Sequence, residues 1–530
     1  MLVYSCRCTR EICCQLRNLR IISGSFDVGT RACWRRVLRL RFFLGSLTHT
    51  VTQVGGVCVV SLLAFLLGCS AAPPVSHPYL GLVVPEQWSS MPTDSIDVEA
   101  GWVGSFNDLK LEAIVMEAIE HNHDLRAAAA RLSAAASTAR IVGADLLPQI
   151  SAGLNGSQQR QNFVGLPIPG FEDDVLSTKF NLFGVSLDTS WELDVWGRIR
   201  AQTSAAYADL EAVQADLSAA RLSLAGQTAK AWFAVTEAKQ QAALARTTLK
   251  SYQITADQVR SRFERGLRPS LDLRLALSHV GTAEALYQER QEQYERAIRQ
   301  LEILVGRYPD GLIEGAERLP DIPTATPAGV PADVLSRRPD LAAAERQLAA
   351  ADARITQARA SLYPRISLTT STGTISDQLR DLTDGDFFVW SIAGNLLQPI
   401  FEGGRLLADL DRTEAVAREA LERYTSIALQ AFSEVESAFV AEALLAKREE
   451  ALHTAAEQAI AAHGLAQDRY RSGLEKFTTV LDAQQRELNA ESQRIAVRRL
   501  RLDVRINLHL ALGGDFVYEH DEQEEEATSS

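Results

Sequence analysis

The stretch FGVSLDTSWEL, residues 183–193, alternates between two kinds of side chain. Its odd-numbered positions are mainly apolar or aromatic and its even-numbered positions are small or polar, which is the two-residue period of a β-strand with one apolar face. Directly after it, residues 199–262 contain no proline and one glycine, Gly226, while apolar residues recur at helical spacing. The sequence therefore predicts a half-apolar strand followed by a single, very long helix.

This unit of strand and long helix occurs twice in the chain. Landmark residues in the two halves stand at equal separations, which indicates an internal repeat. The pairs are Asp124 to Pro148 and Asp340 to Pro364 (24 positions), Gly197 to Gly266 and Gly404 to Gly473 (69 positions), and Gly266 to Gly306 and Gly473 to Gly513 (40 positions). Only the stretch 148–197 is longer than its partner 364–404, and we expect its nine extra residues in one variable loop.

Each half is expected to form a helix, a strand, a loop, a strand, a very long helix, a turn and a helix. Alternations at 150–154, 366–370 and 390–396 supply the other three strands. Each strand is predicted near the roughly 9–11 residues that cross a bilayer in a tilted barrel. The second long helix covers 406–470. About 65 residues at ~1.5 Å each span roughly 100 Å, so such a rod must pack on other rods.

Four strands cannot close a barrel. An open sheet in lipid would leave edge N–H and C=O groups unpaired at several kcal/mol each, so the barrel must close between chains. Two chains give eight strands, whose interior is filled by side chains, whereas three give twelve and leave a lumen. We therefore expect a mainly α fold with a membrane β-barrel portion, assembled as a homotrimer with a 12-stranded barrel.

The N-terminal region is the only part of the chain with cysteine, so no disulfide framework or thiolate metal site can exist after it. Residues 57–69 are an apolar run of signal-peptide length preceded by arginines, and we expect 1–68 to be a signal region with an over-extended N-terminus. Its nine arginines and two acids carry +7, which takes the formal charge from -13 for the chain to -20 for the remainder. This strongly negative charge after residue 68 argues against nucleic-acid binding. The seven cysteines are Cys6, Cys8, Cys13, Cys14, Cys33, Cys58 and Cys69.

The run Leu66-Leu67-Gly68-Cys69 resembles a bacterial lipobox, in which the cysteine thiol is acylated. The alternative is a plain signal or an uncleaved anchor. Acyl chains add roughly 0.8 kcal/mol of binding per buried methylene, so acylated Cys69 would hold the protein firmly in lipid. By the same resemblance, Ser70 in place of an aspartate implies outer-membrane sorting.

In order and spacing, these features resemble the outer-membrane factor family (TolC and OprM-like proteins, NodT-type efflux lipoproteins). The resemblance covers essentially everything after Cys69. Its marks are the lipobox, the paired Asp-Leu…Pro segments, Trp196-Gly197-Arg198, FSEVE at 432–436 and YRSGLEKFTTVLDAQ at 470–484. His123 departs from the proline that relatives often carry before Asp-Leu, as Pro339 does here, which concerns only that helix start.

The resemblance implies a TolC-like channel-tunnel, in which the twelve strands continue into twelve helices. It implies a passive, gated exit duct for small molecules in a tripartite efflux system, with no catalysis and no cofactor. The partners would be a periplasmic adaptor (membrane fusion protein), an inner-membrane pump and the lipid of a Gram-negative outer membrane. Two alternatives stay open: a type I secretion exit duct, and a periplasmic coiled-coil scaffold lipoprotein without a pore, which would have no use for four strands.

Gly266 and Gly473 fall where each long helix meets its returning partner, and glycine gives a tight turn the backbone freedom it needs. Turn formation alone would explain both glycines. The resemblance implies in addition that the tips contact the adaptor through Leu267, Arg268 and Leu474.

Asp482 lies nine residues beyond the second tip, where the resemblance implies an acidic ring that narrows the closed tunnel. Three converging carboxylates would repel one another and attract cations; otherwise Asp482 is an ordinary solvated side chain. Thr479 stands where some relatives carry a second acid, so the constriction is expected to be less negative. Tyr470 matches an aromatic that helps to hold the tip closed, and packing alone would also explain it.

The predicted divisions are a signal region (1–68), a lipidated segment (69–108), a first repeat (109–306), an equatorial linker (307–330), a second repeat (331–514) and an acidic disordered tail (515–530). The segments 70–108 and 306–331 and the tail are expected to form a belt. No metal site is expected, because His121 and His123 are two residues apart and do not share a helix face.

Overall fold

The computed structural model describes residues 73, 84–90, 95–96, 101–163, 177–323 and 326–514. All of them belong to one of two compact units, residues 70–530. The other unit, residues 1–69, contains the expected signal region and Cys69, which lie outside the described residues, as does the expected tail 515–530.

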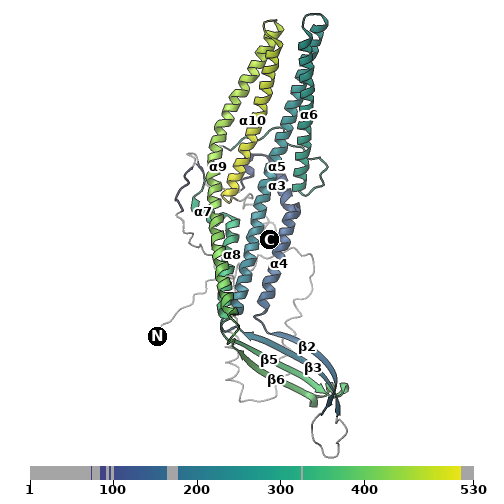
Figure 1. The fold of residues 1–530 in the computed structure, drawn as a ribbon, viewed down its shortest axis with the longest axis vertical. Coiled ribbons are helices and arrows are strands. Elements are labelled where there is room, and N and C mark those ends of the chain that lie inside the picture. Colours follow the sequence, from purple (N-terminus) through teal and green to yellow (C-terminus); the bar gives the residue numbers. More distant parts are fainter. Residues whose placement is uncertain are drawn as a thin grey trace, which may run out of the picture. The chain divides into compact units, whose positions relative to one another are not determined.

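Long helices and one antiparallel sheet make up the described unit (Figure 1). The first half contains α3 (Leu109–His121), α4 (His123–Ala144), β2 (Gln149–Asn162), β3 (Ser177–Leu193), α5 (Arg198–Glu264) and α6 (Ser270–Leu304). The second half contains α7 (Pro331–Arg337), α8 (Pro339–Ala360), β5 (Arg365–Ser376), β6 (Phe388–Leu397), α9 (Arg405–Arg471) and α10 (Phe477–Ala511). Two short 3-10 helices, Leu379–Thr383 and Gly385–Phe387, link β5 to β6.

Three pairs of helices have equal lengths in the two halves, in line with the equal glycine separations in the sequence, whereas α3 has 13 residues and α7 has 7. α4 and α8 have 22 residues each, α5 and α9 have 67, and α6 and α10 have 35. The helices α4 and α8 begin at equivalent residues, His123 and Pro339, although only α8 carries proline there. Asn122 caps α4 instead, since its side-chain oxygen accepts a hydrogen bond from the Leu125 N–H at 3.0 Å.

The sheet has the order β2-β3-β5-β6, with every neighbouring pair antiparallel. The strands of the first hairpin have 14 and 17 residues, against 12 and 10 in the second. The prediction that the extra residues lie in one loop is therefore wrong, and so is a uniform strand length of 9–11. Backbone pairing continues through polar residues: Gln158 lies opposite Asn181, and its amide donates to the Asn181 side chain at 2.9 Å.

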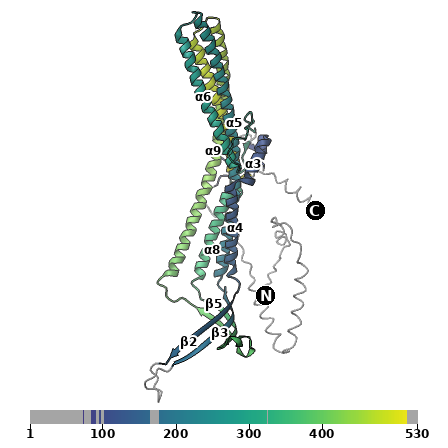
Figure 2. The ribbon, with the colours of Figure 1, turned by 90° about the vertical axis from the view of Figure 1, so that its right-hand side faces the viewer.

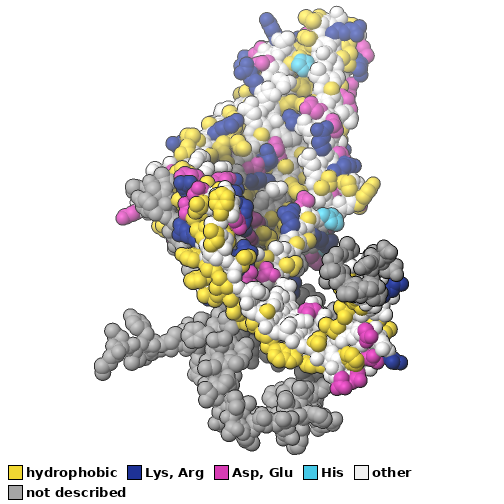
Figure 3. All heavy atoms as spheres, turned by 60° about the horizontal axis from the view of Figure 1, so that its bottom comes forward, with side chains coloured by type: hydrophobic (Ala, Val, Ile, Leu, Met, Phe, Trp, Pro, Cys, Tyr) yellow, Lys and Arg dark blue, Asp and Glu magenta, His cyan; other side chains and the backbone are white. Residues whose placement is uncertain are grey.

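The two faces of the sheet differ in chemistry, as the alternation in residues 183–193 predicts. Cross-strand partners share a face, and those on the apolar face include Leu154 opposite Val185, Trp191 opposite Leu368, and Ile366 opposite Leu396. Hydrophobic side chains form a band across this end of the described unit (Figure 3). In the described ranges, no helix is long and apolar enough to cross a bilayer.

Four apolar cores hold the helices together, and the smallest consists of Ala208 of α5 with Ala349 and Ala350 of α8. One, around Trp102 and Trp232, packs α3, α5, α6 and α10, and another, around Trp88 and Tyr424, packs α8, α9 and α10. The third joins the α5–α6 hairpin to the α9–α10 hairpin near their turns. The strand β1 (Ser95–Ile96) pairs in parallel with β4 (Thr326–Pro327), which places two of the segments expected to share a belt side by side.

Candidate functional site

The α5–α6 and α9–α10 turns lie at the end of the described unit opposite the sheet (Figures 1 and 2). Both turns use a glycine with left-handed backbone, Gly266 at φ +72° and Gly473 at φ +78°. The following residue closes each turn, because the Leu267 N–H donates to the Arg262 carbonyl at 2.9 Å and the Leu474 N–H to the Arg469 carbonyl at 2.8 Å.

Turn geometry explains the two glycines, but it does not explain why leucine follows each of them. Leu267 is 66% exposed and Leu474 is 71% exposed. Large apolar side chains at the outermost point of a helical hairpin contribute nothing to its core, so they are available to a partner. These are the positions that the family resemblance assigned to adaptor contact.

Tyr470 joins the two hairpins. Its ring is 3% exposed and lies 5.4 Å from the ring of Phe477, centroid to centroid. The guanidinium carbons of Arg262 and Arg268 lie 5.2 and 4.7 Å from the Tyr470 ring centroid, within the range of cation–π attraction. Arg268, which was expected to face an adaptor, is thus held against Tyr470. The sequence did not indicate Arg262 at all, because nothing in it shows which helix crosses Tyr470.

Asp482 and Thr479 lie on the exposed face of α10, whereas Phe477, Val480 and Leu481 are buried on the other. The structure therefore does not bring Asp482 together with Tyr470. The Asp482 carboxylate accepts a hydrogen bond from the Arg486 guanidinium at 2.9 Å, a pair of residues four apart with both side chains well exposed. This partner could have been found in the sequence from its spacing.

The Thr479 hydroxyl donates to the Glu475 carboxylate at 3.1 Å. The backbone N–H of Lys476 and this hydroxyl lower the pKa of Glu475 from its ordinary value. A negative charge is therefore present beside Thr479 although the threonine itself carries none. The sequence predicted only that threonine at position 479 makes the constriction less negative.

Polar contacts connect α5 to α10 further from the tip. The Gln241 side chain donates to the Ser492 carbonyl at 2.9 Å and accepts from the Ser492 hydroxyl at 2.8 Å. The Gln484 amide donates to the Ser251 hydroxyl at 2.9 Å. Sequence reasoning missed these residues, since uncharged polar side chains on a long helix look the same whether they face solvent or a neighbouring helix.

The FSEVE stretch at 432–436 holds the N-terminal segment against α9. Phe432 packs edge-on against the Trp88 ring at 6.1 Å, and the Glu436 carboxylate accepts the N–H groups of Ser89 and Ser90 at 2.7 and 3.0 Å. Glu434 pairs with Arg338 at 2.7 Å. This mark of the family is therefore an anchoring site within the chain.

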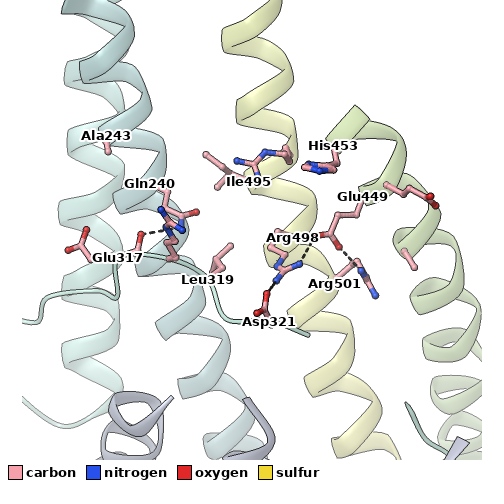
Figure 4. Close-up of a pocket in the computed structure, with 14 residues that line it drawn as sticks. Gln240, Ala243, Glu317, Leu319, Asp321, Glu449, His453, Ile495, Arg498 and Arg501 are labelled. Atoms are coloured by element: carbon pink, nitrogen blue, oxygen red, sulfur yellow. Dashed lines mark hydrogen bonds and ion pairs between the residues drawn. The ribbon is translucent and has the colours of Figure 1, made fainter. Parts of the chain in front are cut away.

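A groove of about 830 Å³ opens between α5, α9, α10 and residues 317–321 (Figure 4). Ion pairs cross it: Arg498 joins Asp321 and Glu449, and Arg501 joins Glu449. Side chains of both signs of charge line the groove, so it presents no single-sign patch to a ligand. Within the described ranges, no three His, Cys, Asp or Glu side chains are grouped so that they could hold a metal ion.

Comparison with known proteins gives consistent similarities. A family model described as outer membrane efflux protein matches residues 114–307 and 330–514. The chain is 31% identical over 466 residues to the pyoverdine export outer membrane protein OpmQ of Pseudomonas putida KT2440, covering 86% of the chain and 97% of the relative. It is 32% identical over 468 residues to the outer membrane protein OprJ of Pseudomonas aeruginosa PAO1, covering 86% and 94%.

Solved structures of outer-membrane channels are similar as well. The OprN channel matches with a TM-score of 0.76 at 28% identity, over 84% of this chain and 100% of that one. The open state of the Neisseria gonorrhoeae MtrE channel matches with a TM-score of 0.73 at 29% identity, over 85% and 100%.

Proposed function

Since the chain belongs to the outer membrane efflux protein family, we propose that three copies of it close into one channel that a periplasmic adaptor engages at the helical tips. The chain is an efflux channel of the outer membrane, the outer-membrane component of an efflux pump, and not an enzyme.

The edges of the sheet support closure between chains. β2 and β6 are the two edge strands, and each pairs on one side only within the described sheet. Because all four strands alternate in direction, β6 of one copy meets β2 of the next in the antiparallel sense. Three copies give twelve strands, which removes every edge and leaves a lumen.

The single observation that carries the proposal is the join between an apolar-faced sheet and two 67-residue rods of equal length. At ~1.5 Å per residue each rod spans roughly 100 Å, enough to extend the lumen well beyond a bilayer of ~30 Å. A periplasmic scaffold without a pore has no use for the sheet, and the family assignment sets that alternative aside.

Small molecules are the proposed cargo. The names of similar proteins state pyoverdine export, toluene efflux and antibiotic efflux. No name of that kind among these relatives points to protein secretion, so the type I secretion alternative has the weaker support.

Native mass spectrometry and planar-bilayer recording of the purified protein test assembly. We expect the mass of three chains and stepwise conductance. Leu187→Arg, on the apolar face, should abolish insertion, because a midplane arginine facing lipid costs about 2–4 kcal/mol per chain. Ser190→Arg, on the polar face, is the matched control and should insert. A monomer without conductance would overturn the proposal.

Lipid anchoring at Cys69 and the adaptor contact need separate tests. Metabolic labelling with palmitate should mark the wild type and not Cys69→Ser. Site-specific crosslinkers at Leu267 and Leu474 should capture a periplasmic adaptor in cells, whereas a crosslinker at the exposed Leu444, in the middle of α9, should not. Label retained in Cys69→Ser, or equal capture from all three positions, would contradict the respective assignment.

A further inference from the structure

One row of residues crosses the polar face of the sheet at a single level. Ser151 lies opposite Asp188, Asp188 opposite Ser371, and Ser371 opposite Ser391. Cross-strand partners share a face, so the row reads serine, aspartate, serine, serine from β2 to β6. We call these four residues the Asp188 row.

The Asp188 carboxylate is fixed by the two neighbouring hydroxyls. The Ser186 hydroxyl donates to one carboxylate oxygen at 2.7 Å, and the Ser371 hydroxyl donates to the other at 2.6 Å. Asp188 forms no ion pair with any residue that the structure describes. Its charge is therefore solvated by hydroxyl groups and held in place without being neutralised.

The other charges on this face are arranged differently. Glu192 is bound by the Arg198 guanidinium through both carboxylate oxygens at 3.0 Å. Arg365 stands six residues before Ser371 on β5, about 20 Å away at ~3.3 Å per residue. Among the described strand residues, Asp188 is thus the unpaired carboxylate on the polar face.

We propose that Asp188 is a specificity-determining residue, which gives the sheet part of the channel a preference for cationic over anionic solutes. This inference rests on the proposed trimer, in which the Asp188 row becomes a ring of three aspartates and nine serines around the lumen. A lumen with a low-dielectric wall focuses the field of such fixed charges on the solute path. Because two hydroxyls hold each carboxylate, the ring stays in position as solutes pass.

The magnitude of the effect follows from screening. Charges act over a Debye length of about 10 Å at 0.1 M salt and about 3 Å at 1 M. Three carboxylates around a water-filled lumen should therefore shift the cation-to-anion permeability ratio by about threefold at ~0.1 M salt and hardly at all at ~1 M. This salt dependence is part of the prediction.

Reversal potentials in asymmetric KCl, measured on the full-length channel, test the inference. Asp188→Asn should lower the cation-to-anion ratio at low salt and leave single-channel conductance at high salt unchanged. Ser190→Asn, on the same face two residues away, is the matched control and should behave as the wild type. An unchanged ratio in Asp188→Asn would overturn the inference while the channel assignment stands. A wild-type protein that opens no channels would instead overturn the proposed function.

A chemical reporter makes the sign of the effect visible, because the sequence after Cys69 contains no cysteine. In Asp188→Cys, an anionic methanethiosulfonate reagent should restore the cation preference and a cationic reagent should reverse it. The wild type treated with the same reagents is the control. Equal ratios after both reagents would show that residue 188 does not face the solute path and would overturn the inference.

Discussion

The guanidinium carbon of Arg268 lies 4.7 Å from the ring centroid of Tyr470, so the turn of the first helical hairpin touches the last turn of α9 in the second. Arg262 approaches the same ring at 5.2 Å. Both contacts are made across the seam along which the two hairpins would have to part for the tip to open.

Replacing Tyr470 by alanine should loosen that seam. Each cation–π contact contributes about 0.5–2 kcal/mol, and the buried ring adds its packing against Phe477. Tyr470→Ala should therefore raise the basal conductance in planar bilayers. Tyr470→Phe keeps the ring and loses only a hydroxyl that has no hydrogen-bond partner among the described residues, so it should conduct as the wild type. Equal conductance in Tyr470→Ala and wild type would separate Tyr470 from gating.

Asp482→Ala should raise basal conductance and weaken cation preference, because it removes the converging negative charge from the proposed gate. Arg486→Ala is the informative counterpart, since it leaves the carboxylate without its 2.9 Å partner and should strengthen cation preference. Neither should change the melting temperature, because exposed pairs of this spacing contribute only about 0.3–0.5 kcal/mol. Currents identical to the wild type in both variants would remove Asp482 from the gate.

The tip glycines and leucines should separate turn formation from partner binding. Gly266→Ala and Gly473→Ala place a side chain on left-handed backbone, at a cost of about 1–2 kcal/mol each, although no described atom stands within 4 Å of the new methyl group. Both alanine variants should therefore have a lower melting temperature than the wild type. Leu267→Ser and Leu474→Ser should keep the wild-type melting temperature and lose adaptor capture. Full capture by the double serine variant would contradict adaptor contact at the tips.

His509 should make the protein sensitive to acid. Burial, together with the nearby Arg505, lowers the pKa of His509 to about 3. Below pH ~6.5 the unfolded chain takes up a proton that the folded chain refuses, so stability falls by about 1.4 kcal/mol per pH unit as the pH drops toward 3.

The His509 ring stacks on the Trp102 ring with their centroids 5.6 Å apart, so the test variant should keep an aromatic ring at position 509. His509→Phe should lose less stability than the wild type between pH 7 and pH 5, by about 2 kcal/mol per chain. Thermal melting at both pH values measures it, and His453→Gln, at an exposed position, should match the wild type. A parallel loss in His509→Phe and wild type would contradict the assignment.

Glu442 should be essential for stability. Its carboxylate accepts hydrogen bonds from both Arg501 and Arg505 at 3.0 Å, and Arg505 is 2% exposed. Removing one partner from a buried ion pair costs about 3–5 kcal/mol, because the remaining buried charge loses that compensation. Glu442→Gln should therefore lower the melting temperature strongly. Glu419→Gln, which removes an exposed pair with Arg423, should leave it unchanged.

The sequence was sufficient for the features that depend on local periodicity. Both long helices were predicted to within two residues, since an uninterrupted apolar stripe has few other ways to be buried. Strand lengths were not predictable, because backbone pairing carries β2 and β3 through polar residues such as Gln158 and Asn181 that show no alternation. The predicted glycine turns match the structure, since a left-handed backbone position favours glycine over any other residue.

The partners of the candidate site residues were mostly beyond the sequence. Arg486 could have been found from its position four residues after Asp482, because both lie on one helix face. Arg262 and Ser251 could not, since their contacts with Tyr470 and Gln484 depend on how two distant helices cross. The FSEVE stretch was recognisable as a family mark. Its contact with Trp88 was not predictable, because it requires a fold in which residues some 350 positions apart meet.

The matching lengths of α5 and α9 restrict how this molecule can evolve. A single residue inserted into one of them would advance everything beyond it by ~1.5 Å and rotate it by about 100°, so that its tip would turn away from the other. Only simultaneous changes in both, or insertions near seven residues that restore the facing, would keep Arg268 over Tyr470. Insertions and deletions among related chains should therefore collect in the connections between strands, where no matched helix lengths have to be kept.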